Sequence, residues 1–271
     1  MQHRDIENVK KIGVDEIQVF RGHQYFTLVY QIDQGMRRLL WCAQERKAKT
    51  LLAFFHWFGK ERSNKLEFVC SDMWPAYISV IRKKASNALN ILDRFHIMKK
   101  FNEAIDQVRR NEVRKLKEEG KENVLIGSRW LLLKKPANLT EKQTAGLDKL
   151  LKINLNSIKA YLMREDFQRF WEYKNPLMAL KFMEDWAEKA IKSDIDPMKK
   201  VAKMLEKHKE LIANWFKSDE VLSSGVVEGL NLKAKLTMRK AFGYKSPEVL
   251  RIALYHTMGN LPEPEGTHRF C

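Results

Sequence analysis

The chain has 271 residues, and 50 Lys and Arg residues against 34 Asp and Glu residues give it a formal net charge of +16 at pH 7. This excess favours a polyanionic partner such as nucleic acid, and a hydrophobic fraction of 44% excludes a disordered basic tail. No apolar run approaches the roughly 20 residues that span a bilayer, and the polar N-terminus is unlike a secretory signal. Three cysteines without a CxxC motif argue against a disulfide scaffold or a zinc finger. We therefore expect a cytoplasmic protein with no membrane partner.

The N-terminal third of the chain predicts a mixed sheet. Five β-type runs lie at residues 11–19, 25–32, 39–43, 66–70 and 88–92. Turn-sized gaps separate the first three runs, which predicts an antiparallel meander. Helical periodicity over residues 51–58 and 74–81 separates the later runs. The order βββαβαβ predicts an α/β fold in which helices flank a five-stranded mixed sheet.

The chain from Arg94 onward is predicted to be helical. Breaks are expected near Gly120, Gly127, Pro136, Pro176 and Pro197. Residues 223–242 predict a strongly basic helix with Ser223 and Ser224 as candidate N-caps. Residues 246–258 predict a further helix, whose start SPEVL has the form of a capping box, and 261–271 predict a tail.

Two aspartates belong to the predicted sheet. Asp15 shares its strand parity with Ile17 and Val19 and would point toward an apolar side, although strand interiors are depleted in Asp. The alternative is an edge strand on which Asp15 is solvated. Asp72 follows an apolar strand in CSDMWPAY, at the end where open α/β sheets carry their sites. The alternative is an ordinary N-cap of the helix that contains Pro75.

Three more candidates follow along the chain. Asp93 and His96, in LDRFHIMKK, would meet at the same rim of the sheet, or Asp93 could simply cap the next helix. Glu228 lies among small and apolar neighbours in SSGVVEGLNLKAKLTMRK. On a helix it shares a face with Asn231, Lys235 and Arg239, which suits a metal ligand beside phosphate-binding groups. The alternative for this face is a solvated row of charges.

The order of these motifs resembles a known family. The strings IGVDEIQVFRGHQYFTLV, FVCSDMWPAY, LDRFHIMKKFNEAIDQVRR and SSGVVEGLNLKAKLTMRKAFGYKS are similar to the catalytic domain of bacterial insertion-sequence transposases of the ISL-three family, which belongs to the DDE superfamily. The resemblance covers the chain from about Val9 to about Met258. It implies a ribonuclease-H-like core at residues 1–96 and 222–260, with an all-helical insertion at 97–221 before the last catalytic helix.

The resemblance implies a catalytic triad of Asp15, Asp72 and Glu228, with Asp93 and His96 in an Asp-x-x-His signature of related transposases. Phosphodiester cleavage and strand transfer develop charge that two divalent ions can stabilise. Hard Mg²⁺ or Mn²⁺ takes oxygen ligands, so we expect Asp15 to bridge both ions, Asp72 to hold one and Glu228 the other. His96 is expected near the scissile phosphate or beside Asp72.

Two basic surfaces are predicted to contact DNA phosphates, which gives affinity without sequence information. The first surface consists of Asn231, Lys233, Lys235, Arg239, Lys240 and Lys245. The second consists of Arg94, Lys99, Lys100, Arg109 and Arg110. The tryptophans of the insertion, Trp130, Trp171, Trp186 and Trp215, are expected to pack in a helical core for the most part, although one could stack on an extruded base.

The family usually carries an N-terminal zinc ribbon and helix-turn-helix region, and this chain begins almost at its first predicted strand. We therefore expect a truncated copy that acts in the bacterial cytoplasm at the nucleoid. It would bind transposon ends and target DNA as a homodimer or a higher synaptic complex. Two alternatives stay open: a catalytically inactive DNA-binding remnant, and another ribonuclease-H-like nuclease. The helical insertion before Glu228 disfavours the latter.

Overall fold

One mixed sheet organises the first part of the chain. A computed structural model describes residues 5–20, 22, 24–218, 225–240 and 244–262. The strands are β1 (Lys11–Phe20), β2 (Gln24–Asp33), β3 (Met36–Gln44), β4 (Phe68–Ser71) and β5 (Leu89–Leu92), in the spatial order β3-β2-β1-β4-β5. The meander β1-β2-β3 is antiparallel, and β4 and β5 join it in parallel. The predicted five-stranded mixed sheet is therefore confirmed.

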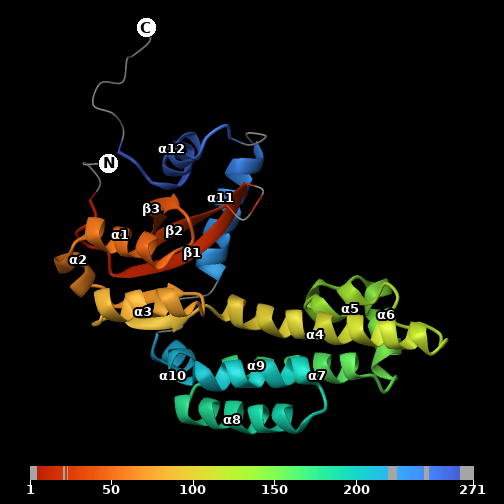
Figure 1. Cartoon of the computed structure of the whole chain (residues 1–271). Helices are drawn as coiled ribbons and strands as arrows, with labels where there is room; N and C mark the ends of the chain where they lie inside the picture. The colour runs from red at the N-terminus through yellow and green to blue at the C-terminus, as the bar shows by residue number, and fades with distance from the viewer. Residues whose placement is uncertain (1–4, 21, 23, 219–224, 241–243, 263–271) are drawn as a thin grey trace. The chain divides into compact units, whose positions relative to one another are not determined.

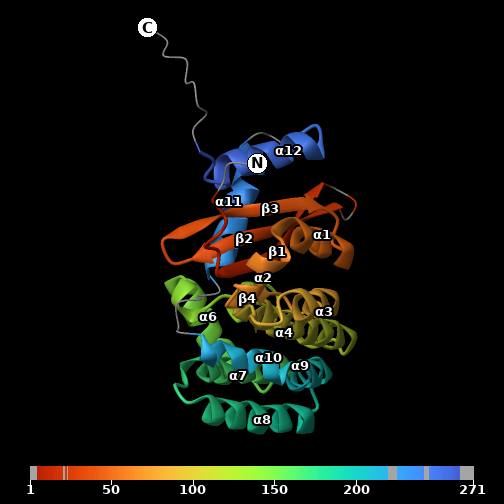
Figure 2. The ribbon, with the colours of Figure 1, turned by 90° about the vertical axis from the view of Figure 1, so that its left-hand side faces the viewer.

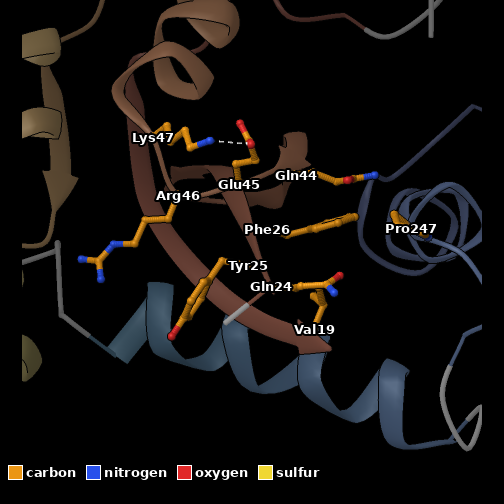
Figure 3. Close-up of a pocket in the computed structure, with 9 residues that line it drawn as sticks. All are labelled: Val19, Gln24, Tyr25, Phe26, Gln44, Glu45, Arg46, Lys47 and Pro247. Carbon is orange, nitrogen blue, oxygen red and sulfur yellow. Dashed lines mark hydrogen bonds and ion pairs between the residues drawn. The ribbon is translucent and has the colours of Figure 1, made fainter. Parts of the chain in front are cut away.

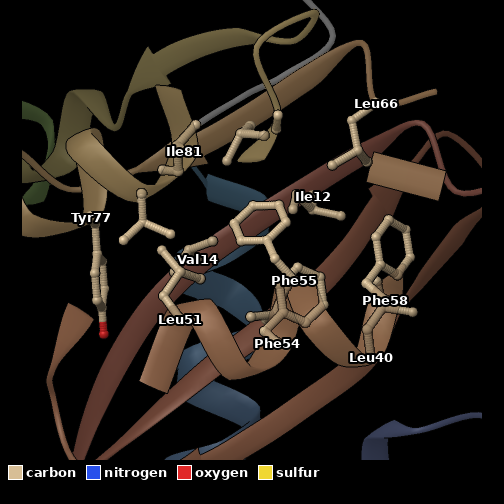
Figure 4. Close-up of a cluster of buried hydrophobic side chains, with 14 of the residues drawn as sticks. Ile12, Val14, Leu40, Leu51, Phe54, Phe55, Phe58, Leu66, Tyr77 and Ile81 are labelled. Carbon is tan, nitrogen blue, oxygen red and sulfur yellow. The ribbon is translucent and has the colours of Figure 1, made fainter. Parts of the chain in front are cut away.

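Helices cover both faces of this sheet (Figures 1 and 2). On one side lie α1 (Ala48–Phe58), α2 (Lys60–Asn64) and α3 (Pro75–Lys84), and on the other α11 (Gly225–Lys240) and α12 (Pro247–Met258). Residues alternate between the two faces along a strand. Ile12 and Val14 of β1 pack against Phe54 of α1 in a buried cluster (Figure 4), whereas Gly13 faces α11.

The glycine at position 13 lets α11 approach the sheet closely. A Cβ atom there would lie 2.5 Å from Cγ2 of Val227, which is buried on α11. Such a distance is far inside van der Waals contact, so a larger residue fits only if the Val227 side chain or its helix moves.

We expect Gly13→Ala to lower the free energy of unfolding by about 1–3 kcal/mol, because the added methyl group overpacks the contact with Val227. In a Val227→Ala background the same substitution should cost much less, since the alanine leaves room. Urea unfolding of the two single variants and the double variant measures this coupling. An equal cost of Gly13→Ala in both backgrounds would contradict the close contact.

The middle of the chain forms a second, helical unit. Its elements are α4 (Arg94–Glu118), α5 (Arg129–Leu133), η1 (Pro136–Asn138), α6 (Glu141–Leu151), α7 (Asn156–Gln168), η2 (Arg169–Glu172), α8 (Pro176–Lys192), α9 (Asp196–Lys207), α10 (Lys209–Ala213) and η3 (Asn214–Lys217). Aromatic rings of Phe101, Phe167 and Trp186 meet within 5.2 Å between centroids at its core. Trp171 stacks edge-on against Trp215 at 5.3 Å, while Trp130 is 55% exposed.

Two compact units result, Met1–Phe95 with Lys217–Cys271, and His96–Phe216. The sequence placed the helical insertion at residues 97–221, and these domain bounds stay a prediction. Within the described residues, no helix is long and apolar enough to cross a membrane.

The predicted N-caps of two helices can be compared with the structure only in part. Ser246 caps α12 by accepting from the Val249 backbone N–H at 3.3 Å, but the predicted capping box is wrong. The third helical position is Val249, which has no acceptor to return the bond. A complete capping box occurs instead between Thr140 and Gln143 at the start of α6. The candidate caps Ser223 and Ser224 lie outside the described residues.

Candidate active site

Three aspartates lie just beyond the parallel pairing of β1, β4 and β5. The in-register row across β1, β4 and β5 consists of Gly13, Cys70 and Ile91. Asp15, Asp72 and Asp93 each come two residues after a member of that row. All three are buried, with exposed fractions of 8%, 8% and 4%. The carboxyl ends of parallel strands meet at one edge of a sheet, so the three residues occupy the same edge.

Asp15 lies on β1, which is the central strand, so the edge-strand alternative is wrong. One carboxylate oxygen, Oδ1, accepts from the Glu16 backbone N–H at 2.7 Å. The other, Oδ2, accepts from Nδ2 of Asn231 on α11. Oδ1 of Asn231 in turn accepts from the hydroxyl of Tyr30 on β2 at 2.8 Å. The carboxylate that the sequence placed on the apolar side of β1 is thus buried but hydrogen-bonded.

Asp72 holds the turn between β4 and α3. Its Oδ1 accepts from the Trp74 backbone N–H at 2.9 Å, and its Oδ2 lies 2.8 Å from Nη2 of Arg46. Asp72 is not the N-cap of α3, because that position is Trp74. Nε of Arg46 lies 2.7 Å from Oε1 of Glu16. Burial disfavours the charged guanidinium, but the charges of Glu16 and Asp72 outweigh it and raise the pKa of Arg46.

Asp93 links β5 to the start of α4. Its backbone N–H donates to the Ser71 carbonyl oxygen at 2.9 Å, and its Oδ1 accepts from the Phe95 N–H at 2.8 Å. The capping contact considered from the sequence is therefore present. Burial, followed by the charges of Asp93 and Asp15, raises the pKa of the Cys70 thiol, so both carboxylates lie near that side chain. His96 belongs to the helical unit, and its role stays a prediction.

Glu228 is exposed on α11, beside the face that packs on the sheet. That face is formed by Val227, Asn231 and Ala234, at helical spacing. Asn231, which we predicted to contact DNA, is buried, and its amide is engaged by Asp15 and Tyr30. The sequence carried a signal for this, since an Asn four residues after Val227 and three before Ala234 must share their buried face.

The donor set of this edge suits a hard divalent cation. Carboxylate oxygens are the ligands that Mg²⁺ and Mn²⁺ prefer. Asp15 lies on β1, Asp72 follows β4 and Glu228 lies on α11, and both β4 and α11 contact β1. Each oxygen of Asp15 accepts a hydrogen bond that orients the carboxylate. Within the described ranges, no three Asp, Glu, His or Cys side chains already converge closely enough to hold one ion. The fit to a metal thus rests on the chemistry of the carboxylates and not on a cluster preformed among the described residues.

The predicted basic surfaces differ in how far their charges are engaged. On α11 and beyond it, Lys233, Lys235, Arg239, Lys240 and Lys245 are exposed. On α4, Lys100 bonds Glu103 at 2.7 Å, and both Nε and Nη2 of Arg109 donate to Asp106. Arg110 also lies 3.5 Å from Asp106, while Lys99 is exposed and Arg94 is partly buried. The α11 surface is the more open of the two.

A groove of about 540 Å³ lies next to Arg46 (Figure 3). Its walls carry aromatic, amide, cationic and carboxylate side chains, namely Tyr25, Phe26, Gln24, Gln44, Arg46, Lys47 and Glu45, with Val19 from β1 and Pro247 from α12. Within the groove, Lys47 pairs with Glu45 at 2.7 Å. Arg46 also bonds Asp72, so the groove borders the carboxylate edge. Sequence reasoning missed Arg46, Glu16 and Tyr30, because their bonds join residues that are distant along the chain.

Comparisons with known proteins agree with this arrangement. A family model described as transposase, for the ISL-three group of DDE enzymes, matches residues 12–254. The chain is 30% identical over 246 residues to the transposase for insertion sequence element IS1001 of Bordetella parapertussis, covering 90% of this chain and 60% of that protein. It is also 30% identical over 284 residues to the transposase for IS1557 of Mycobacterium tuberculosis H37Rv, covering 96% of this chain and 63% of that protein.

The chain thus spans less than two thirds of the length of these curated relatives. The family match includes every residue of the candidate site, from Asp15 on β1 to Glu228 on α11. The mixed sheet with its flanking helices has the ribonuclease-H-like architecture expected of such a catalytic domain. The chain belongs to the ISL-three family of DDE transposases.

Proposed function

We propose that this chain cleaves DNA strands at insertion-sequence ends and joins them to target DNA, using divalent ions held by Asp15, Asp72 and Glu228. The observation that carries the proposal is the matched position of two buried aspartates, Asp15 on β1 and Asp72 just after the adjacent parallel strand β4. Helix α11, which carries Glu228, lies directly against the first of those strands. Membership of a transposase family supports the reaction class.

Two bound Mg²⁺ or Mn²⁺ ions would supply charge stabilisation for the attacking and leaving oxygens of the phosphodiester. The chain itself orients the ligands. Arg46 and the Trp74 N–H fix Asp72, while Asn231 and the Glu16 N–H fix Asp15. Burial of both carboxylates keeps bulk water away and strengthens their interaction with a cation.

DNA would be held by the exposed cations of α11, and a strand would run along the groove beside Arg46. The groove offers the partly exposed ring of Tyr25 for a base and the cation of Arg46 for a phosphate, beside the paired charges of Lys47 and Glu45. Asp93 would complete the edge of the site, and His96 keeps the role that the Asp-x-x-His signature implies. We further propose that the protein works in the bacterial cytoplasm, at the nucleoid, as a homodimer or a higher synaptic complex.

The test is a nicking assay on supercoiled plasmid with Mg²⁺ or Mn²⁺, against the same reaction with EDTA. We expect relaxed and linear products only in the presence of metal. DNA binding without cleavage at any metal concentration would favour the inactive remnant instead. Cleavage products with 3′-hydroxyl ends that join to a second duplex would support strand transfer over simple nuclease activity.

A further inference from the structure

A buried amide joins α11 to two strands of the sheet. The side chain of Asn231 on α11 is only 5% exposed. Its Nδ2 donates to Oδ2 of Asp15 on β1, and its Oδ1 accepts from the Tyr30 hydroxyl of β2 at 2.8 Å. Both polar atoms of the amide therefore have partners, and the three residues form one continuous chain of hydrogen bonds.

The chemistry of the two partners fixes the direction in which the amide faces. An ionised carboxylate only accepts hydrogen bonds, so the amide nitrogen must face Asp15. The amide oxygen then faces Tyr30, whose hydroxyl must donate. Burial, followed by the charges of Asp15 and Cys42, raises the pKa of Tyr30 well above its usual value, so the hydroxyl keeps its proton at neutral pH.

We propose that Asn231 is a positioning residue that holds the Asp15 carboxylate ready for metal binding and ties it to the helix that carries Glu228. This inference rests on the proposed function. Outer-shell hydrogen bonds of this kind orient the ligands of a metal, and their loss weakens metal binding. Tyr30 acts through Asn231, because its hydroxyl fixes the rotamer of the amide.

The location of Asn231 on α11 gives this bond a second consequence. Glu228 lies three residues earlier, so the two side chains are neighbours on the helix surface. One turn of that helix is seated on β1 by the close approach of Val227 to Gly13. Asn231 therefore couples the position of Asp15 to that of the helix with the third proposed ligand.

Gln31 offers a matched control on the same sheet. Its Nε2 donates to Oδ2 of Asp33 at 2.9 Å, and its Oε1 accepts from Nε of Arg38 at 2.8 Å. It is also 5% exposed. The amide of Gln31 is thus as buried as that of Asn231, and each amide donates to one carboxylate and accepts from one donor. It pairs with Ile12 in β1, whereas the partner of Asp15 is Leu28.

The experiment measures the affinity of the DNA-free chain for Mn²⁺ by isothermal titration calorimetry, with urea unfolding in parallel. Asn231→Ala should weaken Mn²⁺ binding by about 10- to 100-fold. Gln31→Ala should leave Mn²⁺ affinity unchanged, although both substitutions remove a buried amide and lower the free energy of unfolding. An equal loss of Mn²⁺ affinity in both variants would reduce the effect to general stability and overturn the inference.

The role of Tyr30 is tested by a double-mutant cycle in the same titration. Tyr30→Phe should weaken Mn²⁺ binding less than Asn231→Ala does. In the Asn231→Ala background, Tyr30→Phe should have no further effect, because the amide through which it acts is gone. If the two substitutions lowered Mn²⁺ affinity additively, Tyr30 would not act on Asp15 through Asn231.

Asp15→Asn separates the inference from the proposal on which it rests. If Asp15→Asn binds Mn²⁺ like the unaltered chain, Asp15 is not a ligand and the proposed metal site itself fails. If Asp15→Asn loses Mn²⁺ binding while Asn231→Ala keeps it, the metal site stands and the positioning role alone is overturned.

Discussion

Asp72→Asn is expected to lower the rate of Mg²⁺-dependent plasmid nicking by roughly 1,000-fold or more, and Asp15→Asn should do the same. Each substitution removes a negative charge that would hold a divalent ion but keeps the size of the side chain. The rate of relaxed-plasmid formation at saturating Mg²⁺ measures the effect. Cleavage by Asp72→Asn at the rate of the unaltered chain would remove Asp72 from the site.

The hydrogen bonds around both residues allow the variants to fold. An Asn at position 72 can still accept from the Trp74 N–H, and Arg46 keeps its ion pair with Glu16. An Asn at position 15 has one acceptor oxygen, so it keeps the bond from either Asn231 or the Glu16 N–H and loses the other. We expect a stability loss of about 1 kcal/mol or less for Asp72→Asn, since Arg46 is partly solvated.

Asp33→Asn is the matched control for the charge change. Asp33 ends β2, and its Oδ2 accepts from Gln31 and from the Lys10 N–H at 3.3 Å. The substitution Asp33→Asn also removes one carboxylate from a strand of the same sheet, but β2 pairs only with antiparallel neighbours. Asp33→Asn should nick plasmid like the unaltered chain. A comparable loss of activity there would show that general changes in charge cause the effect.

The sequence predicted the fold well because the signals are local. Alternating and β-branched residues mark β1 and β2, and the turn at Gly35 between β2 and β3 has φ of 85°, which glycine adopts without strain. The 3.6-residue period marks α1 and α4 in the same way. Gly13, which entered none of the sequence-based predictions, is a further local signal, because a glycine inside a strand often marks the close approach of another backbone or helix.

The bonds that orient the candidate site could not be predicted in this way. Asn231 meets Asp15 across 216 positions of sequence, and Arg46 meets Asp72 across 26. Nothing in the local pattern of either segment names its partner. Helical spacing put Asn231 on the face of Glu228, but only the packing of Val227 on Gly13 decides that this part of the face is buried.

The same packing explains which cations stay available for DNA. Once Val227, Asn231 and Ala234 face the sheet, Lys235 and Arg239 remain exposed on α11, four residues apart. Residues at this spacing are neighbours on a helix surface and can follow one phosphate backbone. On α4, by contrast, Asp106 already pairs with Arg109.

The double charge reversal Lys235→Glu and Arg239→Glu should therefore weaken binding of duplex DNA strongly. The slope of log affinity against log salt is negative, and each lost phosphate contact makes it shallower by about 0.9. The double variant should therefore have a slope that is shallower by about 1.8. At 0.1 M salt this corresponds to roughly 60-fold weaker binding. Fluorescence anisotropy of a labelled duplex across a salt series measures both quantities.

Lys203→Glu with Lys207→Glu is the matched control, because these lysines are also exposed and four residues apart, on α9. Both double variants change the net charge by the same amount, so a nonspecific effect of charge would weaken DNA binding equally in the two. Equal salt slopes in the two variants would contradict a phosphate-binding role for α11. At DNA concentrations that saturate the α11 variant, Mg²⁺-dependent nicking should recover, because Lys235 and Arg239 hold the substrate while the carboxylates perform the reaction.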